Sequence, residues 1–139
     1  MELYDQNIDA LHGIKISFSE WENALFSNVI DEQNFLVCHG CMVVAWLKIN
    51  GLQNTSMAWI SMLIVHNKYH RQGVGTYAVK FAEDFIRSKG FSKTGIHTTE
   101  DNIPARNLYN KCGYVAVERS ECTTGDGIKR TGYTFIKEF

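Results

Sequence analysis

The residues that most clearly suggest a chemical role lie in the segment Tyr69–Thr76. In this segment two glycines and two basic side chains precede an apolar, helix-like stretch. Glycine has no Cβ, so the backbone amides around Gly73 and Gly75 can approach a ligand closely. The amino end of a helix adds unpaired N–H groups and a positive dipole. We therefore predict that this loop binds a phosphate or pyrophosphate, and that His70 and Arg71 strengthen the attraction.

Two general phosphate-binding motifs can be compared with this loop. A Walker A motif needs Gly-Lys-Ser/Thr, whereas Gly75 is followed by Thr76 and a tyrosine, which excludes that motif. Residues 73–78 match the dinucleotide pattern G-x-G-x-x-A, and Glu100 follows roughly 20 residues later. However, a polar, basic hexapeptide (66–71) separates these glycines from the preceding apolar run, and the earlier elements favour antiparallel pairing. The dinucleotide interpretation is therefore the weaker alternative.

A second pattern follows the loop. Residues 102–114 read Asn-Ile-Pro-Ala-Arg-Asn-Leu-Tyr-Asn-Lys-Cys-Gly-Tyr, which resembles the segment N-x-x-A-x-x-L-Y-x-x-x-G-[FY] of the GNAT acetyltransferase superfamily. Residues 70–75, His-Arg-Gln-Gly-Val-Gly, resemble the central motif of that superfamily, Q/R-x-x-G-x-G/A. Two motifs in the expected order are more specific than either alone. The resemblance covers residues 59–114.

The resemblance implies an α/β fold: a GNAT-like mixed, largely antiparallel sheet with splayed central strands, flanked by helices. It also implies that acetyl-CoA is the cofactor and that its pantetheine arm enters between the splayed strands. The implied cofactor-binding residues are Leu63 and Val65 on one strand, Asn102 near the thioester, and, around the pyrophosphate, His70, Arg71, Gln72, Gly73, Val74, Gly75 and Thr76.

The activity implied by the resemblance is direct transfer of an acetyl group to a primary amine of a small molecule or peptide. Such a reaction must take a proton from the amine and supply one to the departing thiolate. The family places a tyrosine within reach of the sulfur at the position of Tyr109, which is the candidate acid. A phenol pKa of about 10 is near enough to that of a thiol, about 8.5, for this transfer. The alternative is that Tyr109 only packs against Ala105 and Cys112.

The base is not evident from the sequence. Many relatives carry a glutamate at the position aligned with Ser61, and serine cannot act as a base near neutral pH. Glu100 is the candidate, and His97 or His66 are further possibilities that would act through water, although each could simply be an exposed polar residue. Direct transfer needs little beyond positioning, so a weak base suffices. The missing glutamate keeps open a non-catalytic acyl-CoA sensor or partner-binding module with the same fold.

Two further departures from the family pattern affect the expected site. His70 stands where glutamine or arginine is usual, which keeps a donor but makes phosphate affinity depend on pH. The N-terminal part, which shapes the acceptor pocket in the family, is shorter than usual. The identity of the acceptor therefore stays open.

Apolar periodicity and capping signals predict the other elements. The first 18 residues are ambiguous: Ile8 and Leu11 suit a helix, whereas Ile14, Ile16 and Phe18 alternate as in a strand. The expected helices are about 20–31 after a capping box at Ser19–Glu22, 74–90, and 104–113. The expected strands are 35–37 and 42–49 around a turn at His39-Gly40, then 58–65, 94–98, 115–118 and 132–136, the last two joined by the loop 123–127.

Composition limits the other possibilities. The 139 residues are 45% hydrophobic, which suits a single domain spanning 1–139. A net charge of −1 argues against a nucleic-acid partner, and the absence of long apolar or signal-like segments predicts a cytoplasmic protein without a membrane association. The four cysteines are expected to be structural thiols, because C-x-x-C at Cys38–Cys41 lacks a second ligand pair for a metal. A homodimer is left open.

Overall fold

The computed structural model describes residue 3 and residues 17–25, 31–53 and 56–139. The helix and strand expected around Ile8 and Ile14 therefore lie outside the described residues. Phe18, which was expected to end that strand, is instead the first residue of a helix.

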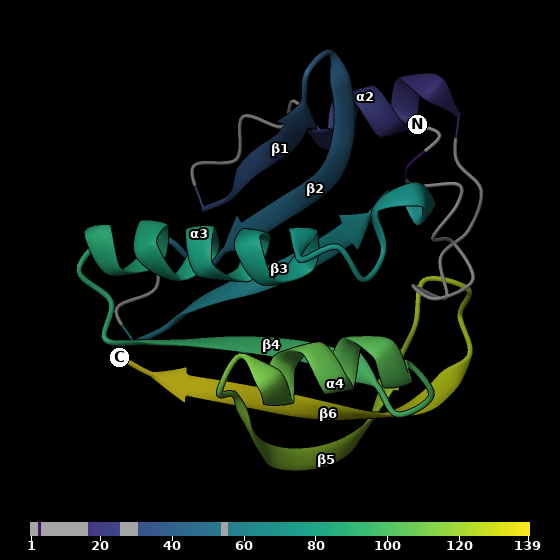
Figure 1. The fold of residues 1–139 in the computed structure, drawn as a ribbon. Helices are drawn as coiled ribbons and strands as arrows, with labels where there is room; N and C mark the ends of the chain where they lie inside the picture. The colour runs from purple at the N-terminus through teal and green to yellow at the C-terminus, as the bar shows by residue number, and fades with distance from the viewer. Residues whose placement is uncertain (1–2, 4–16, 26–30, 54–55) are drawn as a thin grey trace.

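A single six-stranded sheet with the order β1-β2-β3-β4-β6-β5 organises the chain (Figure 1). The strands are β1 Gln33–His39, β2 Met42–Asn50, β3 Ala58–Val65, β4 Lys93–Thr99, β5 Val115–Thr123 and β6 Lys129–Glu138. All neighbouring pairs are antiparallel except β3 and β4, which are parallel. The predicted mixed, largely antiparallel sheet is confirmed.

The parallel pair β3–β4 is joined over only part of its length. Ala58, Trp59 and Ile60 face Thr94, Gly95 and Ile96 in register, and the pairing stops there. On the other side of β3, Ile49 pairs with Ile60 while Lys48 pairs with Met62, so Ser61 is an extra, bulged residue. The bulge bends β3 where its pairing with β4 ends, and the predicted splay of the central strands is confirmed. We call the line between β3 and β4 the seam.

Two helices cover one face of the sheet. α3 (Val74–Ser88) packs on β2, β3 and β4, and α4 (Ile103–Lys111) lies over β4 and β6 (Figure 1). The ends of both agree with the predictions to within two residues, because the signals are local: Gly90 follows α3 at φ +93°, and a proline sits in the first turn of α4. A short 3₁₀ turn, η1 (Asn67–Tyr69), connects β3 to the glycine loop.

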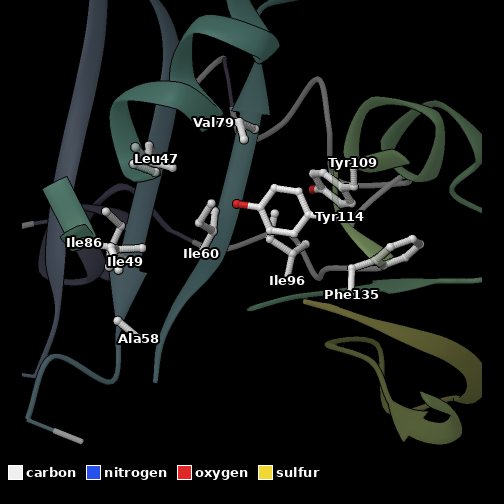
Figure 2. Packing of buried hydrophobic residues seen from close by; sticks show 11 residues of the cluster. Leu47, Ile49, Ala58, Ile60, Val79, Ile86, Ile96, Tyr109, Tyr114 and Phe135 are labelled. Carbon is white, nitrogen blue, oxygen red and sulfur yellow. The ribbon is translucent and has the colours of Figure 1, made fainter. Parts of the chain in front are cut away.

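One apolar cluster connects both helices with both sides of the seam. Figure 2 shows it from close by, with α3 contributing Val79 and Ile86, and the C-terminal half contributing Tyr109, Tyr114 and Phe135. Leu47, Ile49 and Ile96 in this cluster are at most 1% exposed. The sheet is therefore held together below its opening by a continuous core.

The N-terminal helix begins earlier than expected. α2 spans Phe18–Leu25, and its capping box is Ser17 with Glu20. The Ser17 amide donates to Glu20 Oε2 at 2.8 Å, the Glu20 amide donates to Ser17 Oγ at 3.2 Å, and this bonding lowers the pKa of Glu20. The capping box predicted at Ser19–Glu22 is wrong. Residues 26–30, where the helix was expected to continue, lie outside the described residues.

The last two strands are longer than predicted. Asp126 organises the turn between them, because it accepts hydrogen bonds from Thr124 and from the Ile128 amide and pairs with Arg130 at 2.8 Å. These bonds lower the pKa of Asp126. The turn fixes the register of β5 and β6 up to the loop. Residues 119–123 and 129–131, which were not predicted as strand, therefore belong to these strands.

The cysteines are free thiols that differ in burial. Cys112 and Cys122 are half-buried, whereas Cys38 and Cys41 are exposed on the β1–β2 hairpin. The expectation that all four are structural thiols is wrong for the latter two, because the hairpin turn carries them away from the core. Within the described part of the chain, no helix is both long and apolar enough to cross a bilayer.

Candidate active site

The glycine loop ends in an open cradle of backbone amides at the start of α3. Gly73 adopts φ +83°, a conformation that favours glycine, and its carbonyl accepts the first helical hydrogen bond, from the Tyr77 amide at 2.9 Å. The amides of Val74, Gly75 and Thr76 donate to no group of the described residues, and no side chain caps this helix. Three N–H groups at a helix start, without a protein acceptor, form an anion-binding arrangement.

Gly75 serves a different purpose from Gly73. A Cβ at Gly75 would lie 3.0 Å from Leu108 Cδ2, so its small size lets α4 approach the first turn of α3. The two predicted motifs, which are separate in sequence, therefore meet in space at the mouth of the seam.

The polar side chains of the loop turn back onto the protein. His70 Nε2 lies 2.8 Å from the carbonyl oxygen of Val65, and Gln72 Nε2 donates to the Lys68 carbonyl at 2.7 Å. Arg71 is the one non-glycine described residue with positive φ, at +60°. These contacts fix the loop against the end of β3. Direct phosphate contacts by these three side chains stay predictions.

The open end of the seam offers backbone from two strands. Beyond Ile60 and Ile96, residues 61–65 of β3 have no ladder partner on β4, and 97–99 of β4 have none on β3. Leu63 packs partly against the core, which leaves the backbone between it and Val65 at the opening. Thr99 Oγ1 is buried and makes no hydrogen bond within the described chain. Strand backbone that has no ladder partner across the seam, beside an amide cradle, fits an extended ligand with amide groups and an anionic end.

Tyr109 is buried in the core cluster. Its side chain is 7% exposed and its ring centroid lies 5.9 Å from that of Phe135 and 6.2 Å from that of Tyr114. Burial, with a smaller contribution from Cys112, raises the pKa of Tyr109 to about 12. The phenol therefore keeps its proton at neutral pH, so it can donate a hydrogen bond or a proton there but cannot act as a base.

Asn102 and Glu100 lie at the start of α4 and make structural contacts. Asn102 Oδ1 caps the helix by accepting from the Ala105 amide at 3.4 Å. The Glu100 carboxylate lies 3.3 Å from Arg119 and 3.3 Å from the Tyr133 hydroxyl. Its carbonyl also accepts from Arg106 Nη1 at 2.9 Å. Their roles at the cofactor and in catalysis stay predictions.

A hollow of about 280 Å³ lies at the point where the seam opens. It is lined by Asn50, Trp59, Ile60, Ser61 and His97. The sequence pattern did not reveal this grouping, because it depends on the bulge at Ser61 and on the parallel pairing of β3 with β4. The one available signal was strand alternation, which puts His97 on the face opposite Ile96.

A partly buried ion pair bridges the two halves of the molecule behind the site, and sequence reasoning missed it. Lys137 Nζ on β6 lies 3.0 Å from Glu83 Oε1 on α3, and also donates to the Cys112 carbonyl at the end of α4 at 2.8 Å. Glu83 is 7% exposed. Burial and then Glu83 raise the pKa of Tyr114, whose hydroxyl points toward the α3 side (Figure 2). The available signal was a carboxylate among the buried positions of α3.

Comparison with known proteins adds the family context. The model of the acetyltransferase (GNAT) family matches residues 5–114. The chain is 35% identical over 80 residues to a Xenopus tropicalis protein named probable N-acetyltransferase 14, a match that covers 58% of this chain and 35% of that protein. The chain covers between 15% and 50% of the length of the curated relatives that it matches.

Solved structures share the fold. A variant of a spermidine N-acetyltransferase from Vibrio cholerae matches with a TM-score of 0.77 and 16% identity, over 99% of this chain and 89% of that one. A GNAT family acetyltransferase from Elizabethkingia anophelis, with acetyl-CoA bound, matches with a TM-score of 0.69 and 16% identity, over 91% and 93%. At sequence identities this low, the structural similarity shows a shared fold and nothing further.

Proposed function

The chain belongs to the acetyltransferase (GNAT) family, and on that premise we propose that it transfers an acetyl group from acetyl-CoA to a primary amine of a small molecule or peptide. The observation that carries the proposal is the cradle of three unpaired amides at Val74, Gly75 and Thr76, placed at the mouth of the open seam. Acetyl-CoA, when bound, supplies the activated acetyl group. A cytoplasmic location and a homodimer stay predictions.

The residues of this chain suit the two parts of acetyl-CoA. The pyrophosphate would meet the amides of α3, where the helix dipole favours negative charge. The amide groups of the pantetheine arm would pair with the β3 backbone near Leu63 and Val65. His70 Nε2 lies 2.8 Å from the Val65 carbonyl, and this contact would fix the glycine loop against the end of β3, beside the arm.

Tyr109 would supply the donor at the departing sulfur. A phenol with a pKa of about 12 is a weaker acid than a thiol by several pKa units. Complete proton transfer to the sulfur before the carbon–sulfur bond breaks is therefore unfavourable. A hydrogen bond from the phenol, with transfer only as negative charge builds on sulfur, avoids that cost. The deep packing of the ring fixes the position of the phenolic oxygen.

Glu100 would act as a base only through water. Its carboxylate is already shared between Arg119 and Tyr133, and Arg106 lies over the Tyr133 ring at 4.7 Å.

One observation favours a second candidate function. The bulged position at the opening holds Ser61, whose hydroxyl donates to the Lys48 carbonyl at 3.2 Å, where a carboxylate would make an evident base. A non-catalytic module that binds acyl-CoA and a partner would retain the cradle and need no base.

Turnover separates these candidates. The protein is first titrated with acetyl-CoA in a thermal-shift assay, and then release of free CoA thiol is followed with a panel of primary amines and peptide N-termini. We expect a raised melting temperature and amine-dependent thiol release, with Tyr109→Phe losing turnover while keeping its affinity for acetyl-CoA. Binding without thiol release from any amine would favour the module, and absence of binding would reject both.

A further inference from the structure

His97 occupies a distinctive place at the seam. Ile96 and Ile60 form the last pair of β3 and β4, so His97 and Ser61 are the first residues beyond it, one on each strand. Ile96 faces the helices within the core, and strand alternation puts His97 on the opposite face of the sheet. His97 and Ser61 both line the hollow on that face, together with Trp59.

The His97 ring is held against β6. Its Nδ1 lies 3.3 Å from Thr134 Oγ1, the residue that faces His97 in register. A Cβ on Gly132 would lie 2.7 Å from Nε2, so the ring covers this glycine and depends on its missing side chain. Nε2 makes no hydrogen bond with the described residues, whereas Nδ1 has a hydroxyl partner.

The surroundings of His97 contain no rival base within the hollow. The other lining residues, Asn50, Trp59, Ile60 and Ser61, carry no group that accepts a proton near neutral pH. The neighbouring β6 residues on this face, Gly132 and Thr134, are also uncharged. Glu118 of β5 pairs with Thr134 and so lies on the same face, one strand further out.

Glu100 lies on the other face of the sheet. Its carboxylate is bound to Tyr133, which packs against the core beneath Arg106 of α4. Tyr109 is on that helical face as well. On one face of the sheet at the opening, His97 thus has a ring nitrogen, Nε2, without a hydrogen-bond partner among the described residues, and Tyr109 has a protonated phenol on the other face.

Resting on the proposed function, we propose that the hollow receives the acceptor amine and that His97 Nε2 accepts the proton which that amine loses. In the tautomer that donates Nδ1–H to Thr134 Oγ1, the lone pair of the ring lies on Nε2. As the amine nitrogen bonds to the acetyl carbon, the carbon–sulfur bond breaks, the nitrogen's proton passes to Nε2, and the sulfur gains a proton from the Tyr109 side. Solvent exchange restores both groups, and no oxidant or further reactant is needed.

The test compares three variants with the wild type: His97→Asn, Thr134→Val and, as a matched histidine control, His39→Asn on the β1 strand. For each, kcat and kcat/KM are measured across pH 5.5–9 on the amine that the wild type turns over best, and acetyl-CoA affinity is measured separately. We expect His97→Asn to lower kcat about 100-fold and to remove the acid limb of the profile, with acetyl-CoA affinity unchanged. Thr134→Val should lower kcat several-fold and keep the limb, and His39→Asn should match the wild type.

Other outcomes would overturn the assignment. If His97→Asn keeps the kcat and acid limb of the wild type, His97 is not the proton acceptor, and a Glu100→Gln variant that loses the limb would give the role to Glu100. If His97→Asn weakens acetyl-CoA binding as much as turnover, its role is structural. If the wild type binds acetyl-CoA but acetylates no amine, the proposed function fails together with this assignment, a result distinct from the other two.

Discussion

The two ends of the seam are built from the same two strands, yet they differ in almost every physical respect. At the closed end the backbones pair, Ala58 and Thr94 are fully buried, and the Thr94 hydroxyl donates to the Ala58 carbonyl at 2.9 Å. At the open end there is no pairing, and Ser61 and His97 are exposed. A single bulged residue separates them. The closed end therefore contributes to the stability of the fold, while at the open end β3 and β4 have no ladder between them that a ligand would have to displace.

The difference also explains why the opening does not split the molecule. The core cluster runs beneath both ends, and the Glu83–Lys137 ion pair ties α3 to β6 on the helical face. Substitutions in these supports should cost stability, and substitutions at the opening should cost binding or turnover. The predictions below separate the two kinds of effect.

The largest expected effect is at the ion pair. Glu83→Ala leaves the partly buried Lys137 ammonium without its counter-charge and should lower the free energy of unfolding by about 2–4 kcal/mol, measured by chemical denaturation. Arg119→Ala is the control, because its pair with Glu100 is exposed and should contribute about 0–1 kcal/mol. Equal losses in the two variants would mean that the pair does not hold the halves together.

The next effect is on the pH dependence of the free energy of unfolding. It comes from Tyr109, which packs in the core and is predicted to act on the ligand at the open end. Its pKa is raised to about 12 in the folded protein, so the stability it contributes is complete below about pH 10 and is lost as the pH rises toward 12. The loss should be about 3 kcal/mol. Tyr109→Phe should flatten this decline in alkaline denaturation series, leaving the part due to Tyr114. An unchanged decline would show that the Tyr109 phenol is more exposed than described.

A substitution at the closed end should cost stability and leave acetyl-CoA binding intact. Gly95→Ala puts a Cβ 2.5 Å from the Trp59 ring and should destabilise by about 1–3 kcal/mol. The double variant Trp59→Leu with Gly95→Ala should lose less than the sum of the single changes, because the clash is relieved. Acetyl-CoA affinity should be little changed in Gly95→Ala at temperatures where this variant is folded. A large loss of affinity would contradict the assignment of stability to the closed end and of binding to the open end.

The smallest effect on stability is expected at the cradle, where the effect on binding should be specific. Gly73→Ala and Gly90→Ala both place a side chain at positive φ, +83° and +93°, with no atom near the new Cβ. Each should cost about 1 kcal/mol. Only Gly73→Ala, at the start of α3, should weaken acetyl-CoA binding several-fold in calorimetric titration. Equal affinities in the two variants would argue against the cradle.

Local signals predicted α3 and α4 to within two residues, and they did not reveal the long-range features. The glycine after α3 and the proline in α4 mark those helices in the sequence itself. By contrast, both Ser17–Glu20 and Ser19–Glu22 fit the pattern S-x-x-E, so the pattern alone cannot choose the true cap. Where two overlapping matches exist, the tertiary structure decides which serine becomes the N-cap.

The candidate site divides in the same way. The cradle and Tyr109 were predicted from two motifs and a family resemblance. The bulge at Ser61 follows from the register of β2 against β3, and the pair of Glu83 with Lys137 joins residues 54 positions apart. The hollow with His97 needs both the bulge and the parallel pairing. No short stretch of sequence encodes such juxtapositions.

The most direct test of the account is amide hydrogen exchange with and without acetyl-CoA. If the cofactor binds at the open end, exchange should slow at Val74, Gly75 and Thr76 and at those amides of residues 62–65 that face the seam and not β2, with little change at 59–60, which are paired on both sides. Unchanged exchange in the cradle and in the open half of β3 at saturating acetyl-CoA, or protection confined to another surface, would contradict the claim that the open seam is the cofactor site.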